Sequence, residues 1–522
     1  MTDVVGYEVE DKGLKQGAVG FFGSIGVGLA STAPAYSLAA TLGAVVVYSG
    51  VQTMLIVLLA FIPMFLCSWA LKEMNAVDPD CGTSFTWAWR AIGPRTGWFA
   101  GGWGTIASDF LAMASYSQVA GQYFFLLIGA SAIGSDSTSI WVLLVGIAWI
   151  VGLTYICYIG IEISAKLQVA LVVIEVALLL IFGGVALAKV LFFGGAPAYH
   201  ITPSWNWLNP SGIKSFTAFG QAMLLMVFIY WGWDTTTSLN EETEDPGRVP
   251  GVAGVVSTFI LLGTYIFVTA GMESYAGVGD KGLGLSNTAN SSDVLSVMAH
   301  SVFGPSIVGQ ILVKLLLLAI LTSAAATTQT TILPNARTML SMSFHKALPK
   351  YLGRVHSKYQ TPTTTTVWFA IMSIIFYVSL NWLSGGHVMA DAVTATSVFA
   401  AMYLGISSAA CAFHFRDRAL RFSRDSLSKF WIPVASTILL YALMIYAVIT
   451  YGHASNSDVQ VKLPIFGHVG SVMVILVVTA IIGLVWMYYC RLTSPEFFIN
   501  KALRKGPSLT EEGNVINSGF EG

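Results

Sequence analysis

Residues 23–34 of this chain read GSIGVGLASTAP, and residues 228–237 read FIYWGWDTTT. Each stretch interrupts an apolar segment with glycine, proline or polar residues that disfavour a continuous helix. Backbone that leaves the helix inside a bilayer is tolerated only where it is buried in protein or lines a cavity. Two such interruptions in two halves of a chain indicate a solute site near the bilayer midplane. This pair decides the fold prediction.

The composition places the chain in a membrane. Of its 522 residues, 55% are hydrophobic and only 10% are charged, whereas a soluble domain carries about 25% charged residues. The formal net charge of −1 gives no reason to expect a nucleic-acid partner. The five cysteines form no CxxC pair and no metal-ligand spacing, so we expect neither a disulfide framework nor a metal site.

Twelve segments are long and apolar enough to cross a bilayer, which takes roughly 20 residues each. The expected spans are residues 17–47, 51–71, 96–128, 139–157, 162–190, 216–239, 251–275, 306–333, 364–382, 391–413, 430–450 and 468–489. We expect no cleaved signal peptide, because the polar amino terminus lacks a short apolar stretch with a cleavage site. The chain is therefore predicted to be an all-α membrane protein.

Lysine and arginine residues set the predicted orientation. With the amino terminus in the cytoplasm, 21 of the 26 lysines and arginines fall in cytoplasmic segments. Lys189, Lys214, Lys281 and Lys462 fall outside, and Lys314 lies within a helix. We therefore predict a multi-pass protein of the cell inner (plasma) membrane with both termini cytoplasmic.

The first interruption supplies one half of the candidate binding site. Broken helices expose backbone amides that suit a carboxylate and carbonyls that suit a cation, and hydroxyls such as Ser31 and Thr32 can satisfy freed backbone groups. The candidate substrate-binding residues here are Ile25, Gly26, Val27, Gly28, Ala30, Ser31 and Thr32. The alternative is that the glycines allow close packing between helices.

The second interruption carries the more costly residues. A carboxylate at membrane depth is usually functional, and tryptophan faces attract ammonium groups. The candidates are Phe228, Tyr230, Trp231, Trp233 and Asp234. In the alternative interpretation Asp234 caps a short helix near the cytoplasmic boundary, and the tryptophans belong to an interfacial belt.

These stretches resemble a known family. FIYWGWD at residues 228–234, followed by Glu241-Glu242 and by prolines 246 and 250, resembles the sixth-helix signature of amino acid/polyamine/organocation (APC) permeases. Residues 25–30 resemble the family's I-G-x-G-I-F element, with Ala30 in place of phenylalanine. Further matches lie at residues 82–103 and 337–362.

The resemblance implies an inverted five-plus-five helix repeat with discontinuous helices 1 and 6. It divides the chain into a cytoplasmic tail (1–16), a first repeat (17–190), a second repeat (216–413), two further helices (430–490) and a second cytoplasmic tail (491–522). It also implies that a substrate α-carboxylate meets amides near Gly26 to Ser31 and that the ammonium group meets carbonyls near Phe228 to Tyr230. Trp231 or Trp233 would serve as an aromatic gate.

Charged and hydroxyl residues inside the expected helices are candidates for coupling. Glu175 occupies a position where many relatives carry a lysine associated with proton coupling, so Glu175 itself is a candidate proton carrier. The alternative is a pairing of Lys314 with Glu175 or with Asp109. Thr327 and Thr328 either line the pathway or hydrogen-bond their own helix.

We therefore expect a secondary active transporter, with no enzymatic activity and no cofactor, that moves amino acids or related organic amines by alternating access. A proton or an exchanged solute would be its coupling partner, and the lipid bilayer its surroundings. A polyamine (putrescine-type) importer is the first alternative, in which acidic residues replace the backbone amides. A nontransporting membrane sensor is a remote alternative, because the sequence shows no soluble output domain.

Overall fold

The computed structural model describes residues 11–287, 290, 293–384, 388–419, 423–457, 459–463 and 467–499. Residues 1–10 and 500–522, which belong to the two predicted cytoplasmic tails, lie outside the described residues.

The described residues form α-helices and one two-stranded hairpin. The helices of the first half are α1 (Phe21–Thr32), α2 (Pro34–Ser49), α3 (Thr53–Val77), α4 (Ser84–Ala91), α5 (Pro94–Thr96), α6 (Gly104–Leu127), α7 (Ser131–Gly134), α8 (Ile140–Ile159) and α9 (Ile161–Ala188). Those of the second half are α10 (Phe216–Tyr230), α11 (Thr235–Ser238), α12 (Val249–Ala276), α13 (Val294–Phe303), α14 (Ile307–Phe344), α15 (Thr363–Ser384) and α16 (Val388–His414). The remainder are α17 (Arg424–Ser426), α18 (Ile432–Tyr451), α19 (Ser471–Thr493) and α20 (Pro495–Ile499).

Ten segments of the described chain are long and apolar enough to cross a membrane, and one of them, Phe21–Val77, contains α1, α2 and α3. Each of the twelve expected spans overlaps a helix or a pair of consecutive helices. The eighth expected span ends too early at residue 333, because α14 continues through Pro334 to Phe344. Polar side chains in this extension, including Asn335 and Arg337, have partners inside the protein, so the helix need not end where the sequence turns polar.

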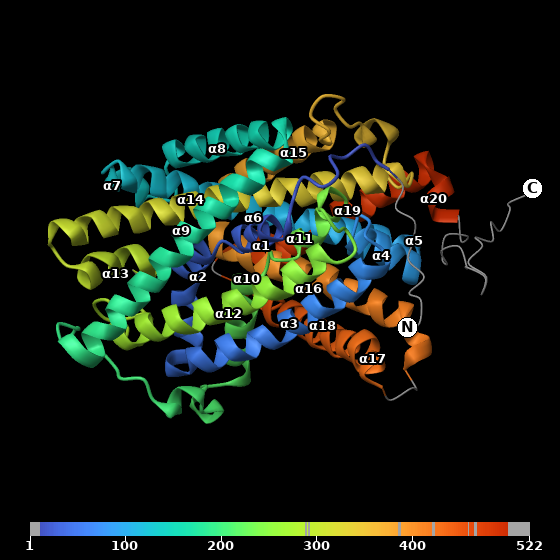
Figure 1. The fold of residues 1–522 in the computed structure, drawn as a ribbon. Helices are drawn as coiled ribbons and strands as arrows, with labels where there is room; N and C mark the ends of the chain where they lie inside the picture. Colours follow the sequence, from blue (N-terminus) through green and yellow to red (C-terminus); the bar gives the residue numbers. More distant parts are fainter. Residues whose placement is uncertain are drawn as a thin grey trace, which may run out of the picture.

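The long helices cross the molecule in a common general direction (Figure 1). The short helices α4, α5 and α20 lie at one end, called here the α4–α5 end, and α7 and α13 lie at the opposite end. Exposed apolar side chains such as Val151 on α8 and Val485 on α19 face outward along the length of the bundle. Large outward-facing apolar side chains are what a bilayer requires of the helices it surrounds.

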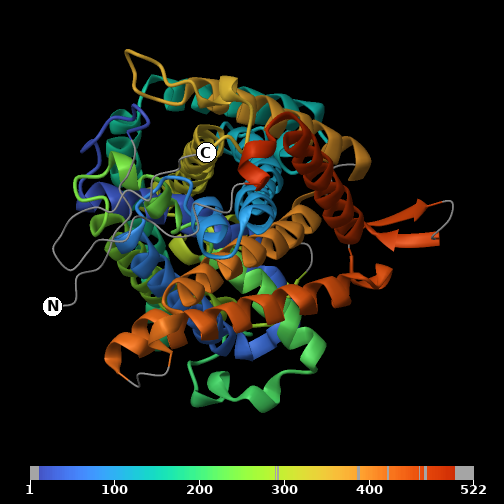
Figure 2. The ribbon, with the colours of Figure 1, turned by 90° about the vertical axis from the view of Figure 1, so that its right-hand side faces the viewer.

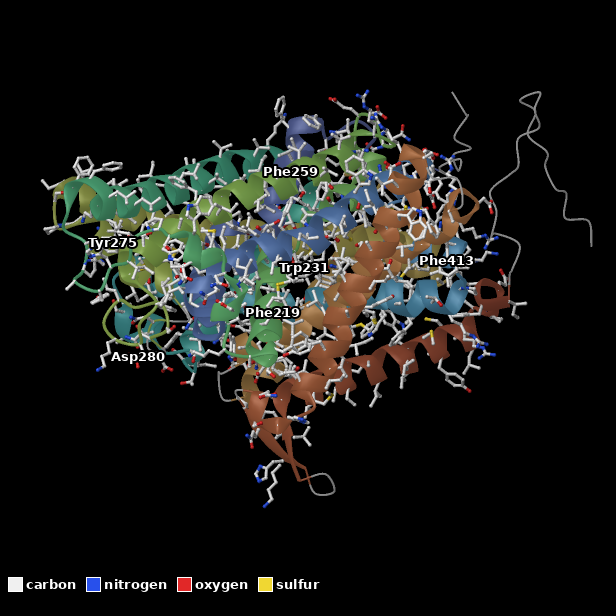
Figure 3. All side chains as sticks on the ribbon, turned by 90° about the horizontal axis from the view of Figure 1, so that it is seen from below. Phe219, Trp231, Phe259, Tyr275, Asp280 and Phe413 are labelled. Carbon is white, nitrogen blue, oxygen red and sulfur yellow. The ribbon has the colours of Figure 1, made fainter. Side chains whose placement is uncertain are left out.

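The two interrupted helices lie together in the interior. The half-helix α10 packs on α2, and α1 contacts α11 and α12. Trp231, which directly follows α10, lies between Tyr275 and Asp280 near one end and Phe413 near the other (Figure 3). The two interruptions, which the sequence predicts to form a solute site, therefore lie in the interior of the helical bundle.

A β-hairpin projects from the helical body between α18 and α19 (Figure 2). Strands β1 (Gln460–Leu463) and β2 (Gly467–Gly470) pair antiparallel, with Val461 opposite Val469. The hairpin lies far along the chain from either helix interruption and contributes nothing to the interior.

Candidate functional site

The two helix interruptions touch each other. The first lies at Ala33, whose φ of 48° ends α1 and begins α2. The second spans residues 231–234, where Gly232 has a φ of 123°. A Cβ on Gly232 would lie 2.6 Å from the carbonyl oxygen of Ser31, so only glycine allows this close approach. The hydroxyls of Ser31 and Thr235 are 2.8 Å apart, which joins the two breaks by a hydrogen bond.

The first break lies at Ala33, inside the predicted stretch 23–34 but after the candidate residues 25–32. Residues 25–32 are helical, so the amides from Gly26 to Ser31 belong to a continuous α-helix rather than to an open anion site. A Cβ on Gly26 would lie 2.3 Å from Val169 Cγ2, and one on Gly28 would lie 2.8 Å from Thr236 Cγ2. These glycines therefore serve close helix packing, which was the alternative interpretation. Ile25, Val27 and Ala30 share that helix and do not line the cavity described next.

A cavity lies beside the touching breaks. Its described lining consists of two carboxylates, several hydroxyls and three aromatic side chains, none of them basic: Ser31, Thr83, Thr105, Asp109, Tyr116, Trp231, Gly232, Asp234, Thr235, Ser238, Thr331, Pro334 and Tyr403. Sequence reasoning had selected four of these residues, namely Ser31, Asp109, Trp231 and Asp234. Gly232 and Thr235 belong to the second predicted interruption, although they were not among the candidate residues. The others come from the loop before α4 and from α6, α11, α14 and α16.

Tyr403 of α16 organises the second break. Its hydroxyl accepts a hydrogen bond from Trp231 Nε1 at 2.5 Å and donates one to Asp234 at 2.7 Å. Asp234 therefore faces the cavity rather than capping a helix at the membrane boundary, since its side chain makes no cap hydrogen bond to α11. Sequence reasoning missed Tyr403, because a tyrosine in an apolar helix carries no distinguishing signal.

The other predicted aromatic residues lie behind the cavity. Phe228 and Tyr230 are buried at the end of α10, where the Tyr230 ring packs edge-on against Tyr265 at 5.0 Å. Trp233 is 1% exposed and packs near Gly254. None of the three lines the cavity, so of the two tryptophans proposed as a gate only Trp231 reaches it.

Asp109 of α6 lies on the same cavity and is 6% exposed. Its Oδ2 accepts a hydrogen bond from Asn335 Nδ2 on α14. The structure gives Oδ1 no partner among the described residues, and this residue is close enough to Asp234 for the two carboxylates to interact electrostatically. The cavity therefore holds two acidic groups with only neutral hydrogen-bond donors.

Glu175 of α9 lies at the start of α2, directly after the first break, where backbone N–H groups have no acceptor within the helix. Its Oε1 accepts hydrogen bonds from the backbone N–H of Ala35 and from the hydroxyl of Ser323, both at 2.7 Å. Its Oε2 is buried without a partner in the described part of the chain. Nearby, the Thr327 hydroxyl donates to Ala30 O at 2.9 Å, which ties α14 to the end of α1. Thr328 donates to Ala324 of its own helix, as its alternative interpretation predicts.

The alternative interpretation, a pairing of Lys314 with Glu175 or with Asp109, does not hold. Lys314 lies in the third turn of α14 and is exposed, whereas the partners of both carboxylates are neutral. Lys314 lies near the amino-terminal end of α14, which begins at Ile307. From there a long side chain can reach the polar boundary of a bilayer. Glu273, near the end of α12, is fully buried.

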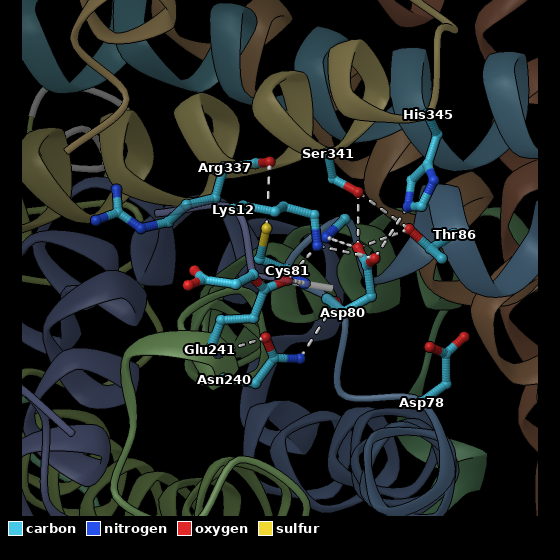
Figure 4. A network of polar contacts seen from close by, with 12 residues as sticks. Lys12, Asp78, Asp80, Cys81, Thr86, Asn240, Glu241, Arg337, Ser341 and His345 are labelled. Carbon is cyan, nitrogen blue, oxygen red and sulfur yellow. Dashed lines mark hydrogen bonds and ion pairs between the residues drawn. The ribbon is translucent and has the colours of Figure 1, made fainter. Parts of the chain in front are cut away.

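A buried polar network closes the α4–α5 end next to this cavity (Figure 4). The ammonium of Lys12 lies 2.6 Å from Glu241 Oε1 and 3.1 Å from Asp80 Oδ2. His345 Nε2 lies 3.1 Å from the same Asp80 oxygen, and Ser341 donates to Asp80 Oδ1 at 2.6 Å. The network joins the amino-terminal segment, the loop before α4, the turn after α11 and α14.

Further contacts reinforce this closure. Arg337 Nη2 donates to Glu242 Oε1 at 2.9 Å in a fully buried ion pair. Val19 pairs with the turn after α11 like a short strand, donating to Glu242 O at 3.0 Å and accepting from Glu244 N at 3.1 Å. Thr83 and Ser238, which line the cavity, lie two and three residues from Cys81 and Glu241.

Burial and the neighbouring basic side chains set the pKa values of two aspartates at this end. Burial alone would raise the pKa of Asp80, but Lys12, His345 and Arg90 hold it well below its ordinary value. Burial raises the pKa of Asp78 to about 7, although Arg90 hydrogen-bonds it. Sequence reasoning missed this network, because it used the basic residues only as an orientation signal.

Comparisons with known proteins agree with this architecture. A family model described as "Amino acid permease" matches residues 19–479. The branched-chain amino acid permease BcaP of Bacillus subtilis is 23% identical over 58% of this chain, and the match spans 62% of that relative, less than two thirds of its length. The low-affinity putrescine importer PlaP of Escherichia coli is 23% identical over 70% of this chain and 75% of its own.

One further relative and one solved structure complete the comparison. The arginine/ornithine antiporter of Latilactobacillus sakei is 24% identical over 63% of this chain and 65% of its own. The crystal structure of MhsT in complex with L-phenylalanine superposes with a TM-score of 0.55 at 17% identity, covering 81% of this chain and 98% of that one. The overall fold is therefore shared with MhsT, which confirms the predicted all-α fold class. The five-plus-five repeat stays a prediction.

Proposed function

Because the chain belongs to the amino acid permease family, we propose that it is a secondary active transporter for amino acids or related organic amines. It would work by alternating access in the cell's inner (plasma) membrane. The solutes for which its relatives are named are branched-chain amino acids, putrescine, arginine and ornithine, and all of them carry an amino group.

One observation carries the proposal: two helix interruptions from opposite halves of the chain meet at a cavity. Gly232 lies against the Ser31 carbonyl, and both residues line the cavity together with Trp231 and Asp234. Irregular backbone is tolerated at membrane depth where it lines a solute site. A purely structural role would not require polar groups from both breaks to converge on one space.

The network at the α4–α5 end supplies a gate for alternating access. In the proposed orientation this end faces the cytoplasm, in keeping with the many lysines and arginines near it. Lys12, Asp80 and Glu241 would separate when the cavity opens to that side, and would re-form when it opens to the other. The fully buried Arg337–Glu242 pair would remain as a fixed contact between α14 and the turn after α11.

We further propose proton coupling through Glu175. This carboxylate is 1% exposed and one of its oxygens has no partner in the described chain, so a proton can bind there without displacing another group. Its contacts with Ala35 and Ser323 join α9 to α2, which follows the first break, and to α14. Protonation weakens an acceptor, so a proton on Glu175 would loosen these contacts.

The test is uptake by the purified full chain in proteoliposomes. A labelled amino acid mixture and, separately, labelled putrescine are offered with and without an inward proton gradient. We expect uptake that the gradient stimulates and that Trp231→Ala removes. The Glu175→Gln variant should lose the gradient stimulation while retaining exchange of internal for external solute. If Glu175→Gln transports with the same pH dependence as the wild type, the proton-carrier role is wrong. Absence of any uptake would contradict the transporter assignment.

A further inference from the structure

Glu273 is a fully buried carboxyl group that the proposed coupling through Glu175 leaves unused. It lies near the end of α12, and neither of its carboxyl oxygens has a hydrogen-bond partner among the described residues. An ionised carboxylate is costly in such surroundings, so we expect this group to hold a proton. Carboxyl groups inside membrane segments mark proton relays in pumps and transporters.

No described cation neutralises Glu273. Helices α1, α2 and α11, which pack against α12, carry no charged residue. The charged side chains described on the other elements packed against α12 are Lys72 and Glu73 of α3, Lys166 and Glu175 of α9, and Lys189 of the helical turn Lys189–Phe193. Lys72 lies against Gly251 at the opposite end of α12. The ammonium of Lys189 donates to Ser301 O at 3.0 Å and faces the Tyr275 ring.

Hydroxyl groups lead from Glu273 along one face of α12. Thr269 and Tyr265 precede Glu273 by four and eight residues, and residues at this spacing lie one above the other on an α-helix. Both are fully buried, and the Thr269 hydroxyl has no partner in the described chain. Cβ atoms four residues apart on a helix are separated by about 5–6 Å, a gap that long side chains or one water can bridge.

The inner end of this column lies beside Glu175. The Tyr265 hydroxyl donates to Ile229 O at 2.7 Å and is close enough to Glu175 for the two groups to interact electrostatically. Helices α9 and α12 run in the same direction here, because Gly183, eight residues after Glu175, lies against Gly271. The column therefore begins at the level of Glu175 and continues beside the remainder of α9.

The outer end of the column lies at the end of the bundle that α7 and α13 occupy. Tyr275, two residues beyond Glu273, donates to Ser301 O of α13 at 2.8 Å, and Figure 3 places it at the end opposite Phe413. In the proposed orientation this end faces the outside of the cell. An inward proton gradient therefore supplies protons at the end where Glu273 lies.

We propose that Glu273 receives the coupling proton at the α13 end and that Thr269 and Tyr265 conduct it to Glu175. This inference rests on the proposed coupling through Glu175 and deepens it by naming the route of entry. In each transfer the O–H bond of Glu273 breaks and one forms on the Glu175 carboxylate. The two hydroxyls each accept one proton and give up their own, so they end the step unchanged. Glu273 then takes another proton from the outer solution.

Uptake by the full chain in proteoliposomes tests the route, with the labelled amino acid mixture and labelled putrescine as probes. Glu273→Gln should lower the maximal rate of gradient-driven uptake by about tenfold or more, because proton delivery becomes limiting. Its KM for the probe and its exchange of internal for external solute should equal those of the wild type. Thr269→Val should act in the same direction. The matched control is Thr264→Val, since the Thr264 hydroxyl donates to Ile260 O of its own helix.

Infrared spectroscopy reads the proton on Glu273 directly, because a carboxylic acid absorbs at a frequency distinct from that of a carboxylate. The wild type at neutral pH should show an acid C=O band that Glu273→Gln lacks. Glu73→Gln, which changes a glutamate paired with Lys72, should retain the band. Transfer to D2O should shift the band within the time of an uptake measurement, since the proposed route connects Glu273 with the solution.

The outcomes separate the entry route from the coupling itself. Wild-type gradient-driven uptake in Glu273→Gln and Thr269→Val, together with lost coupling in Glu175→Gln, would overturn the route and leave the coupling proposal intact. An acid band that does not shift in D2O would also overturn the route, as would an equal loss of uptake in Thr264→Val. Absence of gradient stimulation in the wild type would overturn both proposals. If Glu273→Gln does not fold, Thr269→Val and its control decide.

Discussion

The carboxylate of Glu175 accepts a hydrogen bond from the backbone N–H of Ala35 at 2.7 Å, although the two residues are 140 positions apart in the chain. Ala35 belongs to the first turn of α2, whose amides have no partners within the helix. The contact thus completes the start of a half-helix with a side chain from α9. It also means that α2 cannot move away from α9 without exposing a buried donor.

This relationship predicts the stability of two variants at Glu175. Glutamine keeps a carbonyl acceptor for Ala35 N–H, whereas leucine of similar size leaves both Ala35 N–H and the Ser323 hydroxyl without an acceptor. We expect Glu175→Leu to be less stable than Glu175→Gln by about 1–3 kcal/mol. Thermal unfolding in detergent, followed by tryptophan fluorescence, measures the difference. Equal stability of the two variants would mean that the contact contributes nothing.

The Tyr403 hydroxyl should contribute to solute binding. Tyr403→Phe removes the group that accepts from Trp231 and donates to Asp234, so both side chains lose their fixed orientation at the cavity. We expect KM for the transported solute to rise by roughly tenfold with little change in protein yield. The matched control is Tyr377→Phe, since the Tyr377 hydroxyl is buried without a partner in the described structure. A similar KM in both variants would contradict the role of Tyr403.

Gly232 should tolerate no side chain. Its φ of 123° is strained for any other residue, and an added Cβ would lie 2.6 Å from Ser31 O. Gly232→Ala should separate the two breaks and abolish transport, even where the protein reaches the membrane. Gly263→Ala is the control, because a Cβ there meets nothing within 4 Å and α12 is helical at this position. Transport at the wild-type rate by Gly232→Ala would exclude the close contact as a requirement.

Lys12 should keep the α4–α5 end closed. Lys12→Ala leaves Asp80 and Glu241 facing each other without their shared ammonium, so this end should open more often. We expect maleimide modification of the buried Cys81 to become several times faster, measured by mass spectrometry of the Cys81 peptide. Lys15→Ala, which changes an exposed lysine three residues along, is the control. Unchanged modification of Cys81 in Lys12→Ala would show that other contacts suffice for closure.

Asp78 should give the protein a pH dependence of defined sign. Its pKa in the folded protein is raised to about 7 from an ordinary value of 3.8, so the folded state binds a proton more tightly than the unfolded state. Stability contributed by that proton is complete below the ordinary pKa and is lost as pH rises towards 7, by roughly 1 kcal/mol per pH unit. Relative to Asp78→Asn, the wild-type melting temperature should fall between pH 5 and 7 and then level off. Parallel curves would contradict the raised pKa.

The broad architecture was predictable because each helix that crosses a bilayer needs a minimum length and an apolar composition. Both can be recognised in the segment itself, without knowledge of its neighbours. All twelve expected spans overlap helices, and the second break lies where Gly232 and Asp234 predicted it. The first break lies inside the predicted stretch 23–34, but the sequence did not single out Ala33, because glycines such as Gly26 and Gly28 look alike whether they interrupt a helix or allow a neighbour to approach. Only the positions of Val169 and Thr236, distant in the chain, distinguish the two cases.

The site was predictable where a residue is costly in a bilayer regardless of its neighbours, as for Asp109, Glu175 and Asp234. It was not predictable where an ordinary residue gains a role from its partner. Tyr403 is one example, and Lys12 is another, since a lysine in a polar tail gives no indication that it is buried between Asp80 and Glu241. Lys314 shows the reverse case, in which a charge within a helical segment lies on the outer surface.

The half-helices α1 and α11 are connected at three successive levels. Val19, before α1, pairs with the turn after α11; Gly28 lies against Thr236; and Ser31 bonds to Thr235. Three contacts spaced along both half-helices prevent rotation of one against the other, so we expect α1 and α11 to move as one rigid body. Spin labels placed on α1 and α11 should therefore report a constant separation throughout the transport cycle.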